Sequence, residues 1–113
     1  MGNAEAQFNL GLMYSNGEGV PQNDKEAANW YRKAANQGLA IAQVNLGVMY
    51  DNGEGIPEND VKAYSWWLLA KAQGQKTATS NLDGLKNEMT KEQIAEEQAL
   101  AAKCWESEYQ DCD

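Results

Sequence analysis

The sequence of 113 residues contains no histidine, one phenylalanine, two prolines and two cysteines. Without histidine, the chain lacks both the most common general base and a frequent metal ligand. The usual nucleophilic triads are therefore excluded, and neither Cys104 nor Cys112 has a partner that would activate a thiolate. We expect no catalytic residue, no metal site and no cofactor.

Basic residues are scarce as well. Nine Lys and Arg face seventeen Asp and Glu, which gives a formal net charge of −8 at pH 7. Nucleic acids and anionic membranes reward clustered Lys and Arg, so neither is an expected partner, whereas a basic partner would be attracted. Solubility alone also explains an acidic balance. The chain has no run of about 18 apolar residues and no signal-peptide pattern, so no membrane insertion is expected.

What the sequence does contain is an internal repeat, because residues 3–38 are written again at 39–74. The shared positions include Asn9-Leu10-Gly11 with Asn45-Leu46-Gly47, Met13-Tyr14 with Met49-Tyr50, and Asn16-Gly17-Glu18-Gly19 with Asn52-Gly53-Glu54-Gly55. Repeats of 20 to 50 residues are typical of solenoids, in which each unit is stabilised by stacking on its neighbours. We therefore expect one domain of three units: 3–38, 39–74 and a degenerate third unit at 75–113.

Each repeat has the pattern of helix, turn and helix. Apolar residues spaced three and four apart predict an amphipathic first helix, which should end at Gly17 and at Gly53 in left-handed C-caps. Asp24 and Asp60 are suited to cap the start of the second helix.

Two sets of residues are expected to pack between helices. Gly11 and Gly47 lie in the middle of the first helices, where a glycine costs about 1 kcal/mol relative to alanine, so a close helix approach should offset this cost. Adjacent aromatic residues recur at one place per repeat in the second helices and are expected in the core: Trp30, Tyr31, Trp66 and Trp67.

The third unit differs from the first two. Ala78, Leu82 and Leu85 keep the frame of the first helix, and Thr90 with Gln93 forms a capping box that should open a last helix. That helix is rich in Glu, Gln and Lys. A polar outer face of this kind is expected of a terminal cap.

The run from Ala42 to Pro57, followed by Asp60, Ala63, Trp66, Ala70 and Gln73-Gly74, resembles the Sel-one-like repeat (SLR) family, a longer relative of the tetratricopeptide repeat. The resemblance covers two full repeats and extends to the cap. It implies an all-α fold: a right-handed α-solenoid superhelix of antiparallel helix pairs with a C-terminal capping helix. It also implies an adaptor or scaffold whose first helices line a concave face.

The first helices carry a second stripe, made of positions that differ between the copies. We call it the variable stripe and predict that it binds the partner: Glu5, Phe8, Leu12, Ser15, Ile41, Val44, Val48 and Asp51, with Thr77, Ser80, Gly84 and Asn87 in the third unit. By analogy with tetratricopeptide repeats, this stripe faces the concave surface. Its apolar members would form a patch that a monomer rarely leaves exposed without use. The alternative is that they pack between adjacent helices.

The sequence favours a non-enzymatic module that binds a protein or peptide. An alternative is an inhibitor or immunity protein that neutralises a toxin or effector, since an acidic concave face suits a basic target. A remote alternative is a weak β-lactam-binding hydrolase like some cysteine-rich SLR proteins, which carry a cysteine pair in each repeat, whereas this chain has one pair in all. The recurring Glu18 and Glu54 are explained by hydration or turn capping.

The cysteines carry the prediction of location. In one unbroken helix the Cα atoms of Cys104 and Cys112 would lie about 12 Å apart, beyond the roughly 7 Å limit for a disulfide, so a bridge requires the helix to end between them. We predict this disulfide and hence a bacterial periplasmic or secreted protein whose leader is absent from this chain. The alternative is a pair of free thiols in a cytoplasmic protein.

Overall fold

The computed structural model describes residues 3–86 and 91–106. Within this part of the chain all regular structure is helical, without strands, as the sequence predicts. The helices are α1 (Ala4–Asn16), α2 (Asp24–Asn36), α3 (Ala40–Asn52), α4 (Asp60–Ala72), α5 (Lys76–Lys86) and α6 (Lys91–Glu106).

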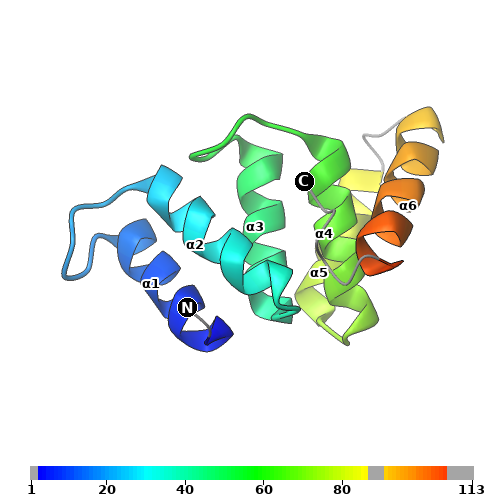
Figure 1. Cartoon of the computed structure of the whole chain (residues 1–113). Coiled ribbons are helices and arrows are strands. Elements are labelled where there is room, and N and C mark those ends of the chain that lie inside the picture. The colour runs from blue at the N-terminus through cyan, green and yellow to red at the C-terminus, as the bar shows by residue number, and fades with distance from the viewer. Residues whose placement is uncertain (1–2, 87–90, 107–113) are drawn as a thin grey trace.

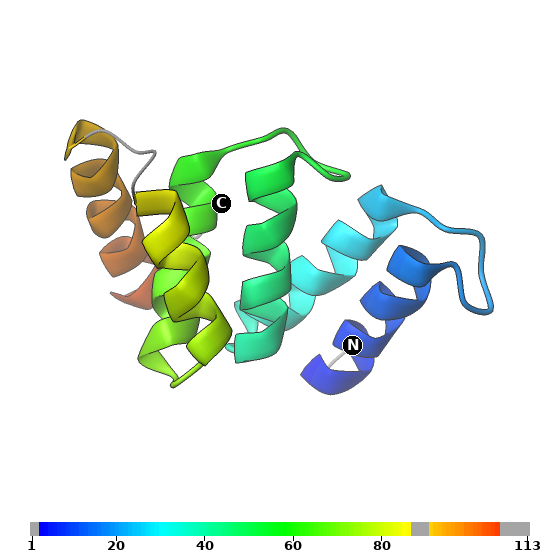
Figure 2. The same cartoon turned by 180° about the vertical axis from the view of Figure 1, so that it is seen from behind.

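The helices are arranged as a row of antiparallel pairs. α1 packs against α2 and α3 against α4, while α2 also packs against α3 and joins the two repeats. Both α5 and α6 pack against α4. Figures 1 and 2 show the resulting elongated molecule, with extents of 43 × 26 × 23 Å. The predicted helical solenoid is confirmed.

The second helices begin one residue earlier than the predicted caps imply. Asn23 and Asn59 have extended backbones, and their side-chain oxygens each accept a hydrogen bond from a backbone N–H three residues on, at 3.1 Å. The prediction of Asp24 and Asp60 as N-caps is therefore wrong. Both are the first residues of their helices, where a carboxylate interacts favourably with the helix dipole.

The first helices end where predicted. Gly17 and Gly53 adopt left-handed conformations with φ of 70° and 68°, and their backbone N–H groups bond to the carbonyls of Met13 and Met49. Only glycine takes up this conformation without a steric penalty, which explains the recurrence of Gly at these two positions.

The mid-helix glycines do allow a close approach. A Cβ at Gly11 would lie 2.5 Å from Cε1 of Tyr31, and a Cβ at Gly47 would overlap the indole ring of Trp67. Trp67 is fixed in place because its Nε1 donates a hydrogen bond to the carbonyl of Val44 at 3.0 Å. Each second helix thus presses an aromatic ring onto the backbone of the first helix.

One of the four aromatic residues expected in the core lies outside it. Tyr31, Trp66 and Trp67 are buried, but Trp30 is only half-buried and has the Lys33 ammonium 4.2 Å from its ring centroid. The cause is the position of the repeat in the row. α6 packs extensively against α4, and the described part of the chain has no helix that packs to that extent against the corresponding side of α2.

Glutamine pairs connect the start of each repeat to its end. Gln37 Nε2 donates to Gln7 Oε1 at 2.6 Å, and Gln73 Nε2 donates to Gln43 Oε1 at 3.0 Å. Gln43 is fully buried and also donates to the carbonyl of Ala35 at 3.2 Å. This second bond ties α3 to the last turn of the preceding repeat.

The third unit keeps the apolar frame predicted for it, since Ala78, Leu82 and Leu85 are buried. α6 begins at Lys91, directly after the predicted start. The predicted cap residue Thr90 lies outside the described residues. Cys104, on the last turns of α6, has no exposed surface and belongs to the core.

Candidate functional site

The variable stripe is divided between surface and core. Its most exposed large hydrophobic residue is Ile41, at 44%. The other members fall into four groups: Glu5, Thr77, Ser80 and Gly84 are exposed, Phe8, Leu12, Ser15, Val48 and Asp51 are half-buried, Val44 is buried, and Asn87 lies outside the described residues.

Val44 is not positioned to contact a partner. It is 5% exposed and belongs to the hydrophobic core. The physical reason is that α3 has helices on both sides, α2 and α4, whereas α1 packs mainly against α2. The alternative of packing between adjacent helices therefore holds for this member of the stripe.

Phe8, the equivalent of Val44 in the first repeat, is intermediate. Its ring centroid lies 5.6 Å from that of Tyr31 with an interplanar angle of 34°, a tilted aromatic contact. The rest of the ring reaches the surface, since the residue is half-buried. Phe8 therefore contributes to both packing and surface.

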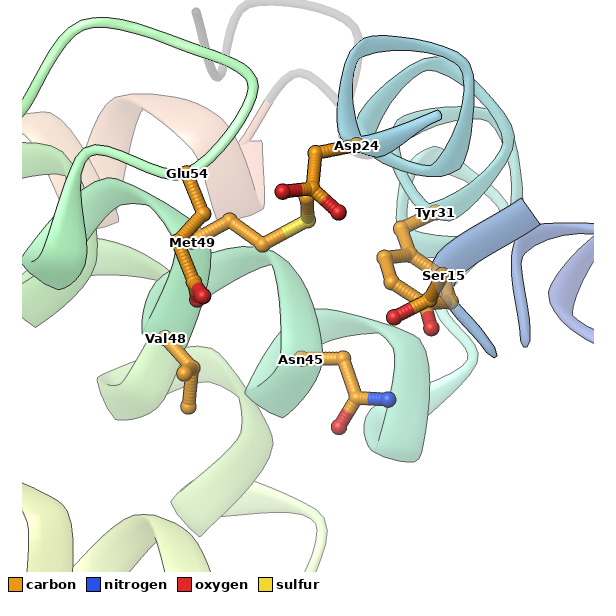
Figure 3. Close-up of a pocket in the computed structure, with 7 residues that line it drawn as sticks. All are labelled: Ser15, Asp24, Tyr31, Asn45, Val48, Met49 and Glu54. Atoms are coloured by element: carbon orange, nitrogen blue, oxygen red, sulfur yellow. The ribbon is translucent and has the colours of Figure 1, made fainter. Parts of the chain in front are cut away.

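A pocket of about 230 Å³ opens where the two repeats meet. Figure 3 shows Asn45, Val48 and Glu54 on the α3 side of this pocket and Ser15, Asp24 and Tyr31 on the other side. We call it the junction pocket. It is lined by Ser15, Asp24, Tyr31, Asn45, Val48, Met49 and Glu54.

The position of Glu54 follows from a contact between backbones. Gly55 has φ of 74°, and a Cβ there would overlap the carbonyl of Asp24 and lie 2.8 Å from the backbone nitrogen of Lys25. The turn after α3 is therefore seated on the first residues of α2. Asn52 Nδ2 also donates to Glu54 Oε1 at 3.4 Å, so the carboxylate of Glu54 is held by a side chain of the same turn.

Tyr31 is the most deeply buried polar group of the junction pocket, at 3% exposure. Burial raises the pKa of its hydroxyl above 10.0, hydrogen bonding with the side chains of Ser15 and Asn45 opposes this rise, and the negative charge of Asp24 adds to it. The hydroxyl is consequently neutral at pH 7. A neutral hydroxyl can both donate and accept hydrogen bonds.

The pocket combines negative charge, neutral polar groups and an apolar wall. Asp24 and Glu54 supply carboxylate oxygens, and Val48 and Met49 supply apolar surface. The seven lining residues include neither Lys nor Arg. Such a site offers hydrogen-bond acceptors and a negative potential rather than a nucleophile with its base.

Sequence reasoning found two of the seven lining residues, Ser15 and Val48, through the variable stripe. It assigned Glu54 only to turn capping and Tyr31 only to the core. The recurrence of Asn at positions 9, 45 and 81 was a signal that could have singled out Asn45. The sequence contained no signal that Asp24 belongs to the pocket, because its proximity to Glu54 depends on how one repeat is placed on the next.

Three further predictions concern the remaining chemistry. Cys112 lies outside the described residues, so its bridge to Cys104 stays a prediction. In the described ranges 3–86 and 91–106, no three Cys, Asp or Glu side chains are grouped to hold a metal ion. None of the helices described there combines the length and the hydropathy that a membrane span requires.

Comparison with known proteins identifies both the type of repeat and the fold. The family model described as Sel1 repeat matches residues 4–39 and again 40–75. The chain is 34% identical to a protective antigen of uropathogenic Escherichia coli strains with an SLR fold, with a TM-score of 0.90 over 98% of this chain. It is 37% identical to a Sel1 repeat protein from Oxalobacter formigenes, with a TM-score of 0.72 over 74% of this chain. It spans 24% of the first structure's chain and 62% of the second. No curated protein matches the sequence.

Proposed function

The chain belongs to the Sel1 repeat family, whose repeats are generally protein-interaction modules, and we propose that it binds a segment of a protein or peptide on its first-helix face without catalysing a reaction. The binding surface is the accessible part of the variable stripe together with the junction pocket. Val44, which is buried, is not part of it.

The observation that supports this function best is the exposure of Ile41 on the helix that also supplies Val48 to the junction pocket. Ile41 and Val48 lie two turns apart on one face of α3, and Val48 lines the pocket. Leu12, on α1, adds a third partly exposed apolar side chain. Apolar groups rimmed by polar ones are typical of surfaces that bind other proteins.

The charge of the chain indicates the character of the bound segment. With a net charge of −8, the module attracts basic segments at long range and repels acidic ones. Attraction of this type raises the association rate and weakens with added salt. We therefore propose a basic segment that also presents an apolar side chain to Ile41.

The test is selection of displayed peptides on the purified full chain, followed by affinity measurement of the enriched peptides. Ile41→Asp should weaken their binding at least tenfold, because it replaces an exposed apolar contact with a charge. Asn29→Asp is the matched control: it adds the same charge at an exposed position on α2, outside the first-helix face. It should change affinity less than twofold.

Both substitutions lie at exposed positions, so the melting temperature should hardly change. Selection of no convergent peptide family, or equal loss of binding in the two variants, would contradict the proposed surface. The stoichiometry of a complex with a natural partner then separates bridging of two proteins from blocking of one.

An extracytoplasmic location remains part of the proposal through the cysteines. The complete burial of Cys104 shows that the C-terminal helix is held in the core, where a crosslink could stabilise it. Intact mass with and without reduction and thiol alkylation decides the point. A mass consistent with one intrachain bridge supports an oxidising compartment, and two alkylated thiols without reduction remove the argument.

A further inference from the structure

We propose that the junction pocket is the binding site for one arginine side chain of the bound segment. This inference rests on the proposed function, because it names the group by which the partner is recognised. It identifies which residue of a basic segment is held, and where.

The charged groups that line the junction pocket are all negative. Asp24 and Glu54 place two carboxylates on the pocket wall, brought there by separate elements, α2 and the turn after α3. Of the cations on α2, Arg32 donates from Nη2 to the hydroxyl of Tyr50 at 3.1 Å, Lys33 lies over Trp30, and Lys25, next to Asp24, is not a lining residue. The lining therefore presents acceptors without a cation of its own.

The polar groups of the junction pocket fit a guanidinium. Arg presents five N–H donors in a planar fork, and the pocket offers the carboxylate oxygens of Asp24 and Glu54 as acceptors. The side chain of Tyr31 already hydrogen bonds with those of Ser15 and Asn45, and the oxygens of these side chains have lone pairs that can accept from a further donor. An ammonium has three donors and is more strongly hydrated, so it would leave more of these acceptors unpaired and cost more to desolvate. The geometry favours arginine over lysine.

The volume of the junction pocket and its apolar wall both suit a single arginine side chain. The volume of about 230 Å³ is below the roughly 300–1,000 Å³ of pockets for drug-sized ligands and cofactors. Val48 and Met49 provide apolar surface against which the methylene stem of an arginine can pack. A side chain entering from a peptide on the first-helix face satisfies both conditions.

The next junction along the row does not reproduce this site. The position of Tyr31 is taken by Trp67, whose indole N–H is already bonded to Val44 and which offers no acceptor. The position of Val48 is taken by Gly84, which provides no wall. The site is thus a property of the junction between the first and second repeats.

The test is NMR titration of the isotope-labelled full chain with Nα-acetyl-arginine methylamide. The citrulline analogue, which has nearly the same shape without the charge, and the lysine analogue serve as comparison ligands. We expect saturable shifts of backbone amides around Ser15, Asn45 and Glu54 with arginine, binding at least several-fold weaker with lysine, and no saturation with citrulline.

Variants with matched controls separate the pocket from general electrostatic attraction. Glu54→Gln and Asp24→Asn should each weaken arginine binding about tenfold, because each removes one charged acceptor. Glu18→Gln and Asp60→Asn remove the same charges at the equivalent positions of the other repeat and should change affinity less than twofold. Circular dichroism and melting confirm that all four variants are folded.

Equal weakening in all four variants would show attraction to an acidic chain rather than a site, and would overturn the proposal. Saturable citrulline binding of equal strength, or lysine binding as tightly as arginine, would overturn it as well. Selected peptides that need Ile41 but carry no arginine would leave the proposed function standing and refute the arginine site. Arginine binding without any selected peptide would do the reverse.

Discussion

The two repeats have nearly the same pattern but different surroundings. Trp66 is 1% exposed while Trp30 is half-buried, and Gln43 is completely buried while Gln7 is 7% exposed. The second repeat has helices on both sides, and the described first repeat has a neighbour on one side. The sequence of a repeat thus sets its helices, whereas its place in the row sets how deeply each side chain is buried.

The equivalent turn glutamates of the two repeats, Glu18 and Glu54, also differ in their surroundings. Glu18 and Glu54 each accept a hydrogen bond from an asparagine two residues earlier, at 3.2 and 3.4 Å. Glu54 also lies against the preceding repeat and lines the junction pocket. The same type of residue that serves a turn in the first repeat therefore also lines the proposed binding site in the second.

The largest expected effect is the difference between the two tryptophans. Trp66→Ala should lower the free energy of unfolding by about 3–5 kcal/mol, because it empties a fully packed volume. Trp30→Ala should cost less than half as much, since part of that ring is already in water and its surroundings can relax. Urea unfolding followed by circular dichroism measures both. Equal losses would contradict the different burial of the two positions.

The next largest effect is the difference in stability between alanine variants of two turn glycines, Gly19 and Gly55. Gly19→Ala and Gly55→Ala both introduce strain at positive φ, worth about 1–2 kcal/mol. At Gly19 the new Cβ would meet the flexible end of Met13 at 3.3 Å, whereas at Gly55 it would meet the backbone of Asp24 and Lys25. Overpacking there should add about 1–3 kcal/mol.

Thermal and urea unfolding of the two alanine variants provide the comparison. Gly55→Ala should also weaken arginine binding, since Glu54 moves with the turn, whereas Gly19→Ala should leave it unchanged. A Gly55 variant as stable as the Gly19 variant would mean that the turn is not seated on α2.

The smallest effect is a pH dependence of stability that comes from Tyr31. The pKa of Tyr31 is raised in the folded state, so its contribution to stability is fully present below about pH 10 and is lost as the pH rises through the folded value. The equivalent Trp67 does not titrate. Unfolding free energy measured between pH 8 and 11 should therefore fall more for the wild type than for Tyr31→Phe. Identical slopes would show that the hydroxyl titrates alike in both states.

Most of the fold could be predicted from the sequence because the repeated pattern carries local signals twice. Gly17 and Gly53 marked the ends of the first helices, and Gly11 and Gly47 marked close packing, by stereochemistry that acts within a few residues. The predicted caps Asp24 and Asp60 were wrong by one position, because Asn23 and Asn59 are equally good caps and the pattern does not choose between neighbours.

The candidate site was harder to predict. Its lining comes from three helices and a turn, so it depends on how the second repeat is placed on the first. The exposure of Trp30 and the burial of Val44 depend on the same placement, which periodicity within a helix does not encode. Ser15 and Val48 were found because they vary between copies, and Tyr31 was missed because a buried aromatic residue has the pattern of a core.

The seating of Gly55 on the carbonyl of Asp24 has a consequence for how such a chain can diverge. The spacing between the two repeats is maintained there by main-chain atoms, which every sequence possesses, and requires one small residue to keep the approach open. Mutations that replace side chains around the junction therefore leave the frame intact. A duplicated repeat that retains this glycine inherits the spacing, and natural selection can then alter the groups facing the partner one at a time.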